Sequence, residues 1–315
     1  MVMEPRCVTF EPVDIASYCQ TITSQLSPHC RSALPAWSKR YAREGRKPHT
    51  VHTLERTAVV AAASFTVAAT LLNRAEPSSD TSVEHLRAEV LQVLPHDEDA
   101  FTEGLELSDG LLFESTGGEG GSSIRVGPPG KPPDRQMNLP APLFGEGLTV
   151  LGQRLWQITW QNGVAIERDA KTLRELRRVT YSGEGWGLCH ESGKKRLVMS
   201  DGTSHLAFRD PDTFAEVGGV EVTQQGKPVP RINELECSGD SVYANLWETD
   251  RIVRIDPATG HVTAEVDASG LLTPDEKSHA SVLNGIAAIP GTGEFLLTGK
   301  YWPKTFRVSF RSTTR

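Results

Sequence analysis

The sequence contains few cysteines and has no acceptor motif for N-linked glycosylation. Five of the 315 residues are cysteine, and the motif Asn-x-Ser/Thr does not occur. Only Cys189 and Cys237 lie after residue 84, and two cysteines are too few to imply a disulfide framework. They could pair only if the fold brought their Cα atoms within about 7 Å of each other. We expect buried free thiols at both positions.

An excess of basic residues is also absent. The chain has 33 lysines and arginines against 40 aspartates and glutamates, a formal net charge of −7. No basic patch and no interleaving of basic with aromatic residues is visible, although these features are typical of proteins that bind nucleic acid. We therefore expect no nucleic-acid partner.

No uncharged run reaches the roughly 20 residues that a membrane-spanning helix needs. The longest candidate is 57–73, which is rich in alanine, follows a basic stretch and precedes an acidic one. That charge order sends the following chain across a membrane, so the run predicts a cleaved signal segment or a short membrane anchor. A buried alanine-rich helix is the alternative.

This interpretation divides the chain into four parts. Residues 1–56 are a targeting or disordered extension, 57–73 the apolar signal or anchor segment, 74–84 a linker, and 85–315 the catalytic domain. It also predicts the secretory pathway or another extracytoplasmic location, with organelle targeting as an alternative.

A short sequence motif occurs five times after residue 84. Its copies are 101–105, 144–148, 185–188, 232–235 and 283–286, and each is followed by a strand-like run. Self-similarity at a period of roughly 40 to 50 residues is typical of β-propeller blades, each of which buries its apolar face against its neighbours. The fourth unit has four strand-like runs, at 232–237, 242–246, 252–255 and 261–266. The sequence therefore predicts an all-β, five-bladed β-propeller with a non-propeller N-terminal extension, and we expect a monomer.

Repeat-equivalent positions locate a site, because the first strands of propeller blades line the central channel. The first ring of equivalent residues is Glu103, Glu146, Trp186, Asn233 and Asn284, and the second is Gly117, Trp160, Gly202, Trp247 and Lys300. Lysine and carboxylate are costly to bury unless they are paired. The two rings predict a pocket with polar groups and aromatic walls.

Structural explanations exist for single members of these rings. Trp160 and Trp247 could pack between blades, Asn233 could cap a strand end, and Glu146 could form a purely structural ion pair with Lys300. The joint occurrence of these residues at equivalent positions favours a site.

Ten motifs in order resemble the plant and bacterial type of glutaminyl cyclase, the glutamine cyclotransferase family. They are FTEGL (101–105), FESTG (113–117), FGEGLT (144–149), LWQITW (155–160), GWGL (185–188), SDGTS (200–204), INELE (232–236), ANLWETD (244–250), VLNGIA (282–287) and TGKYWPK (298–304). The resemblance covers about residues 87 to 310. It implies a five-bladed propeller that closes the N-terminal glutamine of peptides and proteins into pyroglutamate with release of ammonia. This is an aminoacyltransferase reaction without a cofactor or a catalytic metal.

The resemblance also implies roles for residues. Glu146 is similar to the acid/base of the family, and Asn233 and Lys300 are similar to its carbonyl and oxyanion partners. The remaining residues, expected to bind substrate, are Glu103, Phe144, Trp160, Trp186, Trp247 and Asn284. Glu103 departs from the plant pattern, which has glutamine there, so it could bind the substrate's α-ammonium or compete with Glu146 for the proton.

Two other functions fit the same residues. Glu103, Glu146, Asn233 and Asn284 offer oxygen ligands on one axis, which suits a Ca²⁺-dependent propeller hydrolase of the lactonase type; Lys300 in the same pocket argues against it. The second alternative is a propeller that binds peptide N-termini without catalysis.

Overall fold

The computed structural model describes residues 82–118 and 120–313, and strands dominate this part of the chain. The prediction of an all-β protein is confirmed. The predicted extension (1–56), apolar segment (57–73) and most of the linker lie outside the described residues. Within the described residues, no helix is both long and apolar enough to cross a membrane.

Three antiparallel sheets have four strands each, hydrogen-bonded in sequence order. The first sheet consists of β2 (Thr102–Ser108), β3 (Leu111–Thr116), β4 (Ser123–Gly127) and β5 (Arg135–Asn138). The second consists of β6 (Gly145–Leu151), β7 (Arg154–Thr159), β8 (Val164–Asp169) and β9 (Glu175–Thr180). The third consists of β10 (Leu188–Glu191), β11 (Arg196–Ser200), β12 (His205–Arg209) and β13 (Glu216–Glu221), with the 3-10 turn η2 (Ser192–Lys194) between its first two strands.

The remaining long strands form one eight-stranded sheet in the order β16-β17-β18-β19-β1-β22-β21-β20. Its strands are β1 (Glu84–Pro95), β16 (Ile232–Ser238), β17 (Ser241–Leu246), β18 (Arg251–Ile255), β19 (Val262–Asp267), β20 (Leu283–Ile289), β21 (Glu294–Gly299) and β22 (Lys304–Ser312). β1 pairs antiparallel with β22 and, through residues 84–87, parallel with β19. β1, the first described strand, therefore completes the sheet that contains β22, the last strand.

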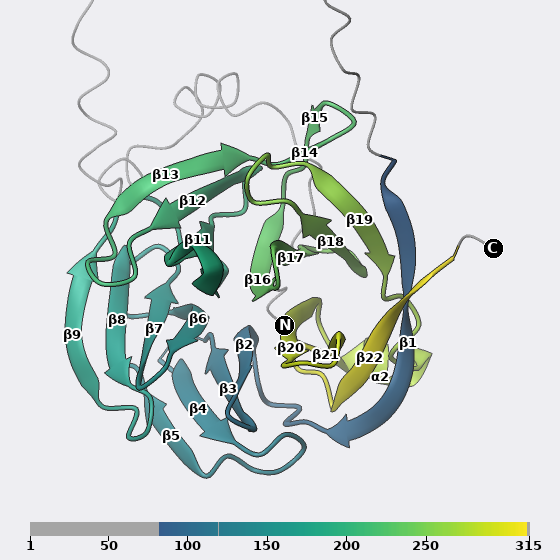
Figure 1. The fold of residues 1–315 in the computed structure, drawn as a ribbon. Coiled ribbons are helices and arrows are strands. Elements are labelled where there is room, and N and C mark those ends of the chain that lie inside the picture. The colour runs from purple at the N-terminus through teal and green to yellow at the C-terminus, as the bar shows by residue number, and fades with distance from the viewer. Residues whose placement is uncertain (1–81, 119, 314–315) are drawn as a thin grey trace, which may run out of the picture. The chain divides into compact units, whose positions relative to one another are not determined.

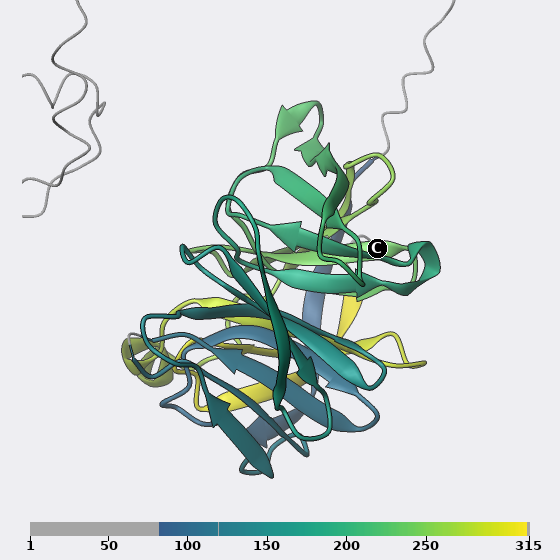
Figure 2. The same ribbon diagram turned by 90° about the vertical axis from the view of Figure 1, so that its left-hand side faces the viewer.

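The sheets surround a common centre (Figure 1). β2, β6, β10, β16 and β20 contact one another in that order, and β20 contacts β2, which closes the circle. In Figure 1 the outermost strands are β5, β9, β13 and β1, and Figure 2 shows the same sheets from the side. The short hairpin of β14 (Thr223–Gln224) and β15 (Lys227–Pro228) projects from this arrangement in both views. The helix α2 (Pro274–His279) precedes β20 and begins with a capping box between Thr273 and Glu276.

Apolar side chains fill the space between neighbouring sheets. In one cluster Val198 and Phe208 of the third sheet pack with Val242 and Val253 of the next four strands. Burial between units rather than within them is the property that the repeat predicted. The four strand-like runs of the fourth unit are confirmed as β16, β17, β18 and β19.

Close approach of the innermost strands explains the glycine in the recurring motif. A Cβ atom on Gly104 would lie 2.7 Å from the backbone nitrogen of Leu148, and one on Gly147 would lie 2.6 Å from that of Leu188. Side-chain carbon atoms do not approach backbone so closely, so only glycine fits where these strands meet.

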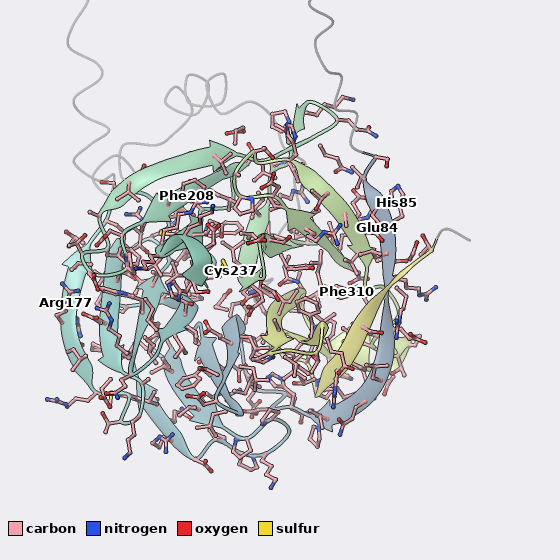
Figure 3. All side chains as sticks on the ribbon, viewed as in Figure 1. Glu84, His85, Arg177, Phe208, Cys237 and Phe310 are labelled. Carbon is pink, nitrogen blue, oxygen red and sulfur yellow. A yellow bond between two sulfur atoms is a disulfide. The ribbon has the colours of Figure 1, made fainter. Side chains whose placement is uncertain are left out.

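The two cysteines form a disulfide, so the prediction of free thiols is wrong. Cys189 on β10 and Cys237 on β16 have Cα atoms 5.4 Å apart, within the range that a disulfide requires. They lie one repeat apart in the sequence, and β10 and β16 are neighbours in the inner circle. Figure 3 places Cys237 toward the centre of the sheets and Arg177 at their periphery.

Candidate active site

In four of the innermost strands, the pairing register with the next strand shifts at the first-ring residue. In β2, Thr102 pairs with Thr116 and Gly104 with Ser115, so Glu103 is an extra residue. Equivalent shifts occur between Gly145 and Leu148, between Ile232 and Leu235, and between Leu283 and Ile286. A bulge breaks the alternation of side chains and re-aims the one it carries. The repeated bulge is thus the local reason why Glu103, Glu146, Asn233 and Asn284 leave the regular pleat.

Glu103, Glu146 and Asn233 border a cavity of about 290 Å³. It is lined by Phe101, Glu103, Phe144, Glu146, Trp160, Trp186, Asn233, Trp247 and Lys300. Asn284 lies behind this lining, is fully buried and donates from Nδ2 to Glu103 Oε2 over 3.0 Å. All nine residues that the sequence nominated are therefore brought together, eight in the wall and one behind it.

Lys300 is paired with Glu103 inside this cavity. Its Nζ lies 2.7 Å from Glu103 Oε1 and 4.4 Å from the centre of the Phe101 ring. Lys300 is 8% exposed and Glu103 1% exposed, so both charges are withdrawn from water. Lys300 thus forms its ion pair with Glu103, and not with Glu146 as the structural explanation of the sequence would have it.

Glu103 and Glu146 interact as a buried carboxyl pair. Burial raises the pKa of Glu103 to about 6, although Lys300, Glu146 and Asn284 act in the opposite direction. The pKa of Glu146 is raised well above its usual value, first by burial and then by the negative charge of Glu103, to which its side chain is hydrogen-bonded. Two carboxyl groups this close share one proton. Burial and the charge of Glu103 favour the protonated form of Glu146.

Two glycines of the second ring make room for aromatic side chains that line the cavity. A Cβ atom on Gly117 would lie 2.3 Å from the ring of Phe144, and one on Gly202 would lie 2.6 Å from the indole of Trp186. Gly202 also has φ +81°, a conformation that favours glycine. The second ring therefore alternates between residues that line the cavity and glycines that admit the neighbouring aromatic side chain.

The aromatic wall consists of two arcs. In one, Tyr301 contacts Phe101, Phe101 contacts Phe144 and Phe144 contacts Trp160, with ring centres 5.1, 6.1 and 5.8 Å apart. In the other, the indoles of Trp186 and Trp247 meet edge to face at 5.6 Å. These spacings are those of favourable aromatic pairs. Trp160 is 37% exposed, so this part of the wall reaches the surface.

Two residues of the site were missed by sequence reasoning. Phe101 lines the cavity, and its equivalence to Phe144 in the recurring motif could have revealed it. Glu184 accepts hydrogen bonds from Trp160 Nε1 and Trp186 Nε1. It lies in the connection between β9 and β10, at the position that Phe101 and Phe144 occupy in their units, but it differs from them in residue type.

A second cavity, of about 340 Å³, lies beside the loop after β4 and is lined by residues including His96, Glu114, Arg125 and Lys131. Its buried polar groups are already paired: Glu114 accepts from Arg125 Nε at 2.8 Å and lies 3.0 Å from His96 Nε2. Neither cavity has a cluster of three or more His, Cys, Asp and Glu side chains suited to a metal ion, and no such cluster occurs elsewhere in residues 82–118 and 120–313.

Comparison with known proteins identifies the family. The family model described as glutamine cyclotransferase matches residues 59–310. The chain belongs to the glutamine cyclotransferase family. The resemblance that the ten motifs indicate is thereby confirmed. The matched range contains every site residue named above.

Two relatives of this family are similar over most of the chain. A glutaminyl-peptide cyclotransferase of Arabidopsis thaliana is 36% identical over 244 residues, which cover 75% of each protein. The crystal structure of the Myxococcus xanthus glutaminyl cyclase is similar with a TM-score of 0.66 and 40% sequence identity, and the match covers 73% of this chain and 99% of that one.

Proposed function

We propose that this protein is a glutaminyl-peptide cyclotransferase, which converts the N-terminal glutamine of peptides and proteins to pyroglutamate and releases ammonia. The observation that carries the proposal is the buried pair of Glu146 and Glu103, with Lys300 beside it, in a cavity walled by aromatic rings. Membership of the glutamine cyclotransferase family and the names of both relatives support the same reaction.

The reaction forms one bond and breaks one. The nitrogen of the free α-amine attacks the carbon of the side-chain carboxamide, and a tetrahedral intermediate with a negatively charged oxygen results. The bond from that carbon to the amide nitrogen then breaks. Because an amide anion is not a viable leaving group, the departing nitrogen must receive a proton while the attacking nitrogen loses one. No other reactant is consumed, and ammonia carries away the original amide nitrogen.

We assign the proton transfers to Glu146. A general acid works best when its pKa lies near the operating pH, and burial beside Glu103 raises the pKa of Glu146 in that direction. In the proposed cycle Glu146 gives its proton to the leaving nitrogen. It recovers one from the attacking amine, so the enzyme returns to its starting state.

We assign stabilisation of the intermediate to Lys300 and Asn233, which both border the cavity. A buried ammonium and an amide donor that are fixed before the reaction stabilise developing negative charge more than water does. Lys300 is held in place by Glu103, and Glu103 in turn by Asn284. In this proposal Glu103 faces the substrate's amino end, and its contact with substrate remains a prediction.

The aromatic side chains would hold the glutamine itself. Phe144, Trp160, Trp186 and Trp247 border the cavity and match the short apolar stem of glutamine. Exclusion of water favours ring closure over hydrolysis of the amide. Both reacting groups belong to one residue, so holding it in a ring-closing conformation supplies much of the catalysis.

We propose that the sheets form a five-bladed propeller spanning 85–315, with β1 as the outer strand of the last blade. Counting the eight-stranded sheet as two four-stranded blades, joined where β1 meets β19, gives five units. The closed circle of five innermost strands supports this count.

A separate proposal rests on the sequence before the propeller. The charge order around 57–73 is that of a signal or anchor segment, and we propose that it directs residues 85–315 out of the cytoplasm as a monomer. Sequencing of the mature N-terminus would show whether the segment is cleaved. Protease protection of the membrane-associated protein would test the export of residues 85–315, and sedimentation equilibrium would test the monomer.

Ammonia release from a glutamine-initiated dipeptide tests the reaction. We expect the full-length protein to release ammonia and the peptide to lose the mass of one ammonia, with and without chelator. The same peptide acetylated on its α-amine is the control, since it retains the carboxamide but has no nucleophile. Failure of the folded protein to act on several such peptides, while still binding them, would favour the non-catalytic alternative, and loss of activity on chelation would favour a metal-dependent enzyme.

A further inference from the structure

Glu184 joins the two arcs of the aromatic wall. Its Oε2 accepts a hydrogen bond of 2.9 Å from Trp160 Nε1 and one of 3.0 Å from Trp186 Nε1. Its Oε1 accepts one of 2.9 Å from Gln161 Nε2. We propose that Glu184 is a positioning residue that fixes both indoles of the wall and adds negative charge beside the acid/base pair. This inference rests on the proposed cyclisation.

The position of Glu184 suits this task. Trp160 directly follows β7 of the second sheet, whereas Trp186 precedes β10 of the third. One carboxylate oxygen therefore links side chains from two neighbouring sheets at the border of the cavity. Without it, the contact from Phe144 to Trp160 and the contact from Trp186 to Trp247 belong to two separately held groups.

A carboxylate is the chemical group that such a junction needs. An indole nitrogen can only donate, and a single carboxylate oxygen has two lone pairs with which to accept from two indoles. Bonds to an ionised acceptor are also stronger than bonds between neutral groups. Each tryptophan is thereby restricted in the rotation that would open the wall.

The charge of Glu184 persists at neutral pH. Burial alone would raise the pKa of Glu184, but the donors Trp186, Gln161 and Trp160 outweigh that effect and lower it. The same negative charge contributes to the raised pKa of Glu146. Glu184 therefore acts on the reaction through the geometry of the wall and through the field at Glu146, without touching the reacting atoms.

Two substitutions separate these effects. Glu184→Ala removes both the acceptor and the charge, whereas Glu184→Gln keeps one oxygen that can accept from the indoles and removes only the charge. We expect Glu184→Ala to lower kcat/KM by up to about 10²-fold, because small misplacements in an active site have effects of that size. We expect Glu184→Gln to retain most of the wild-type kcat/KM. Its pH profile of kcat should shift to lower pH.

Glu175→Gln is the matched control. Glu175 lies on the outer strand β9 of the second sheet and is paired with Arg178, so its loss removes a carboxylate without touching the wall. We expect this variant to match the wild type in kcat, KM and pH profile.

Quenching of tryptophan fluorescence by acrylamide, measured without substrate, decides the geometric part. We expect Glu184→Ala to be quenched more strongly than the wild type and Glu175→Gln. If quenching is unchanged the proposal is overturned, whatever the activity. If the thermal midpoint falls in both Glu184 variants and neither quenching nor the pH profile changes, the role is structural only. A wild type that releases no ammonia contradicts the proposed function, but the quenching result still tests the wall.

Discussion

The ammonium nitrogen of Lys300 lies 2.7 Å from Oε1 of Glu103, across 197 residues of sequence. This pair stands next to Glu146, which has no ion pair of its own with Lys300. The buried positive charge is thus matched by one carboxylate, and burial favours the protonated form of the second carboxyl group. The arrangement assigns different tasks to two chemically identical side chains, a pattern that separates acids from bases in active sites.

Replacing Glu146 with glutamine removes the proposed proton carrier with little change in volume. We expect ammonia release to fall by about 10² to 10⁴-fold, the usual contribution of general acid–base catalysis. The thermal midpoint should remain close to that of the wild type, because burial favours a neutral group at this position and the amide is neutral. Undiminished turnover in this variant would move the acid/base role to Glu103.

Replacing Glu103 with glutamine tests the coupling between the two carboxyl groups. The negative charge of Glu103 raises the pKa of Glu146, so its removal should lower that pKa. If the protonated form of Glu146 is required, the upper limit of the pH–rate profile moves to lower pH. Measurement of kcat between pH 5 and 9 gives the direction, and a profile that moves to higher pH would contradict the assignment.

Replacing Lys300 with methionine removes the buried cation but keeps an apolar side chain. We expect kcat to fall by about 10² to 10³-fold, as is typical for loss of one oxyanion donor. Lys304→Met is the matched control, since Lys304 pairs with Glu276 outside the cavity. Equal losses in both variants would show that the effect is general rather than specific to the site.

The disulfide gives a prediction about stability. Cys189 and Cys237 are separated by 48 positions in the sequence, and the chain-entropy account assigns about 4 kcal/mol to a loop of that length. We expect the double substitution to alanine to lower the free energy of unfolding by about 2 to 4 kcal/mol. Chemical denaturation with and without reductant measures it. A reductant should destabilise the wild type and leave the double variant unchanged.

The buried network around Glu114 predicts acid sensitivity. His96 and Arg125 lower the pKa of Glu114 to about 2 from its usual 4.5, even though burial acts in the opposite direction. An acid with a lowered pKa in the folded state stabilises the fold above pH 4.5, and this contribution is lost as the pH falls towards 2.

Glu114→Gln removes the buried carboxylate that pairs with Arg125 and His96, and leaves Arg125 with Asp97 as its remaining ion-pair partner. We expect a loss of about 3 to 5 kcal/mol at pH 7, and this difference from the wild type should shrink between pH 4.5 and 2. Glu175→Gln, on an exposed pair, should change stability by less than about 1 kcal/mol. A difference that stays constant across the acid range would contradict this account.

The candidate site was predictable to the extent that it follows the repeat. Glu103, Glu146, Asn233 and Asn284 occupy equivalent positions because the same bulge recurs in β2, β6, β16 and β20. Glu184 was not predictable in this way. It occupies the position two residues before the first-ring residue, where Phe101 and Phe144 stand in their units, but it does not share their residue type. Its role depends on two indoles that only the folded chain brings together.

The sequence by itself determined the β-rich unit, the order of its strands and the ring positions that meet at the cavity. These follow from local patterns: alternation of apolar residues, turn residues and a motif that recurs in each unit. Tertiary structure alone decided that Lys300 pairs with Glu103, that Cys189 bonds to Cys237 and that β1 completes the last sheet. Each is a contact between residues far apart in the chain. Its partner is set by how neighbouring sheets pack, and no local pattern encodes it.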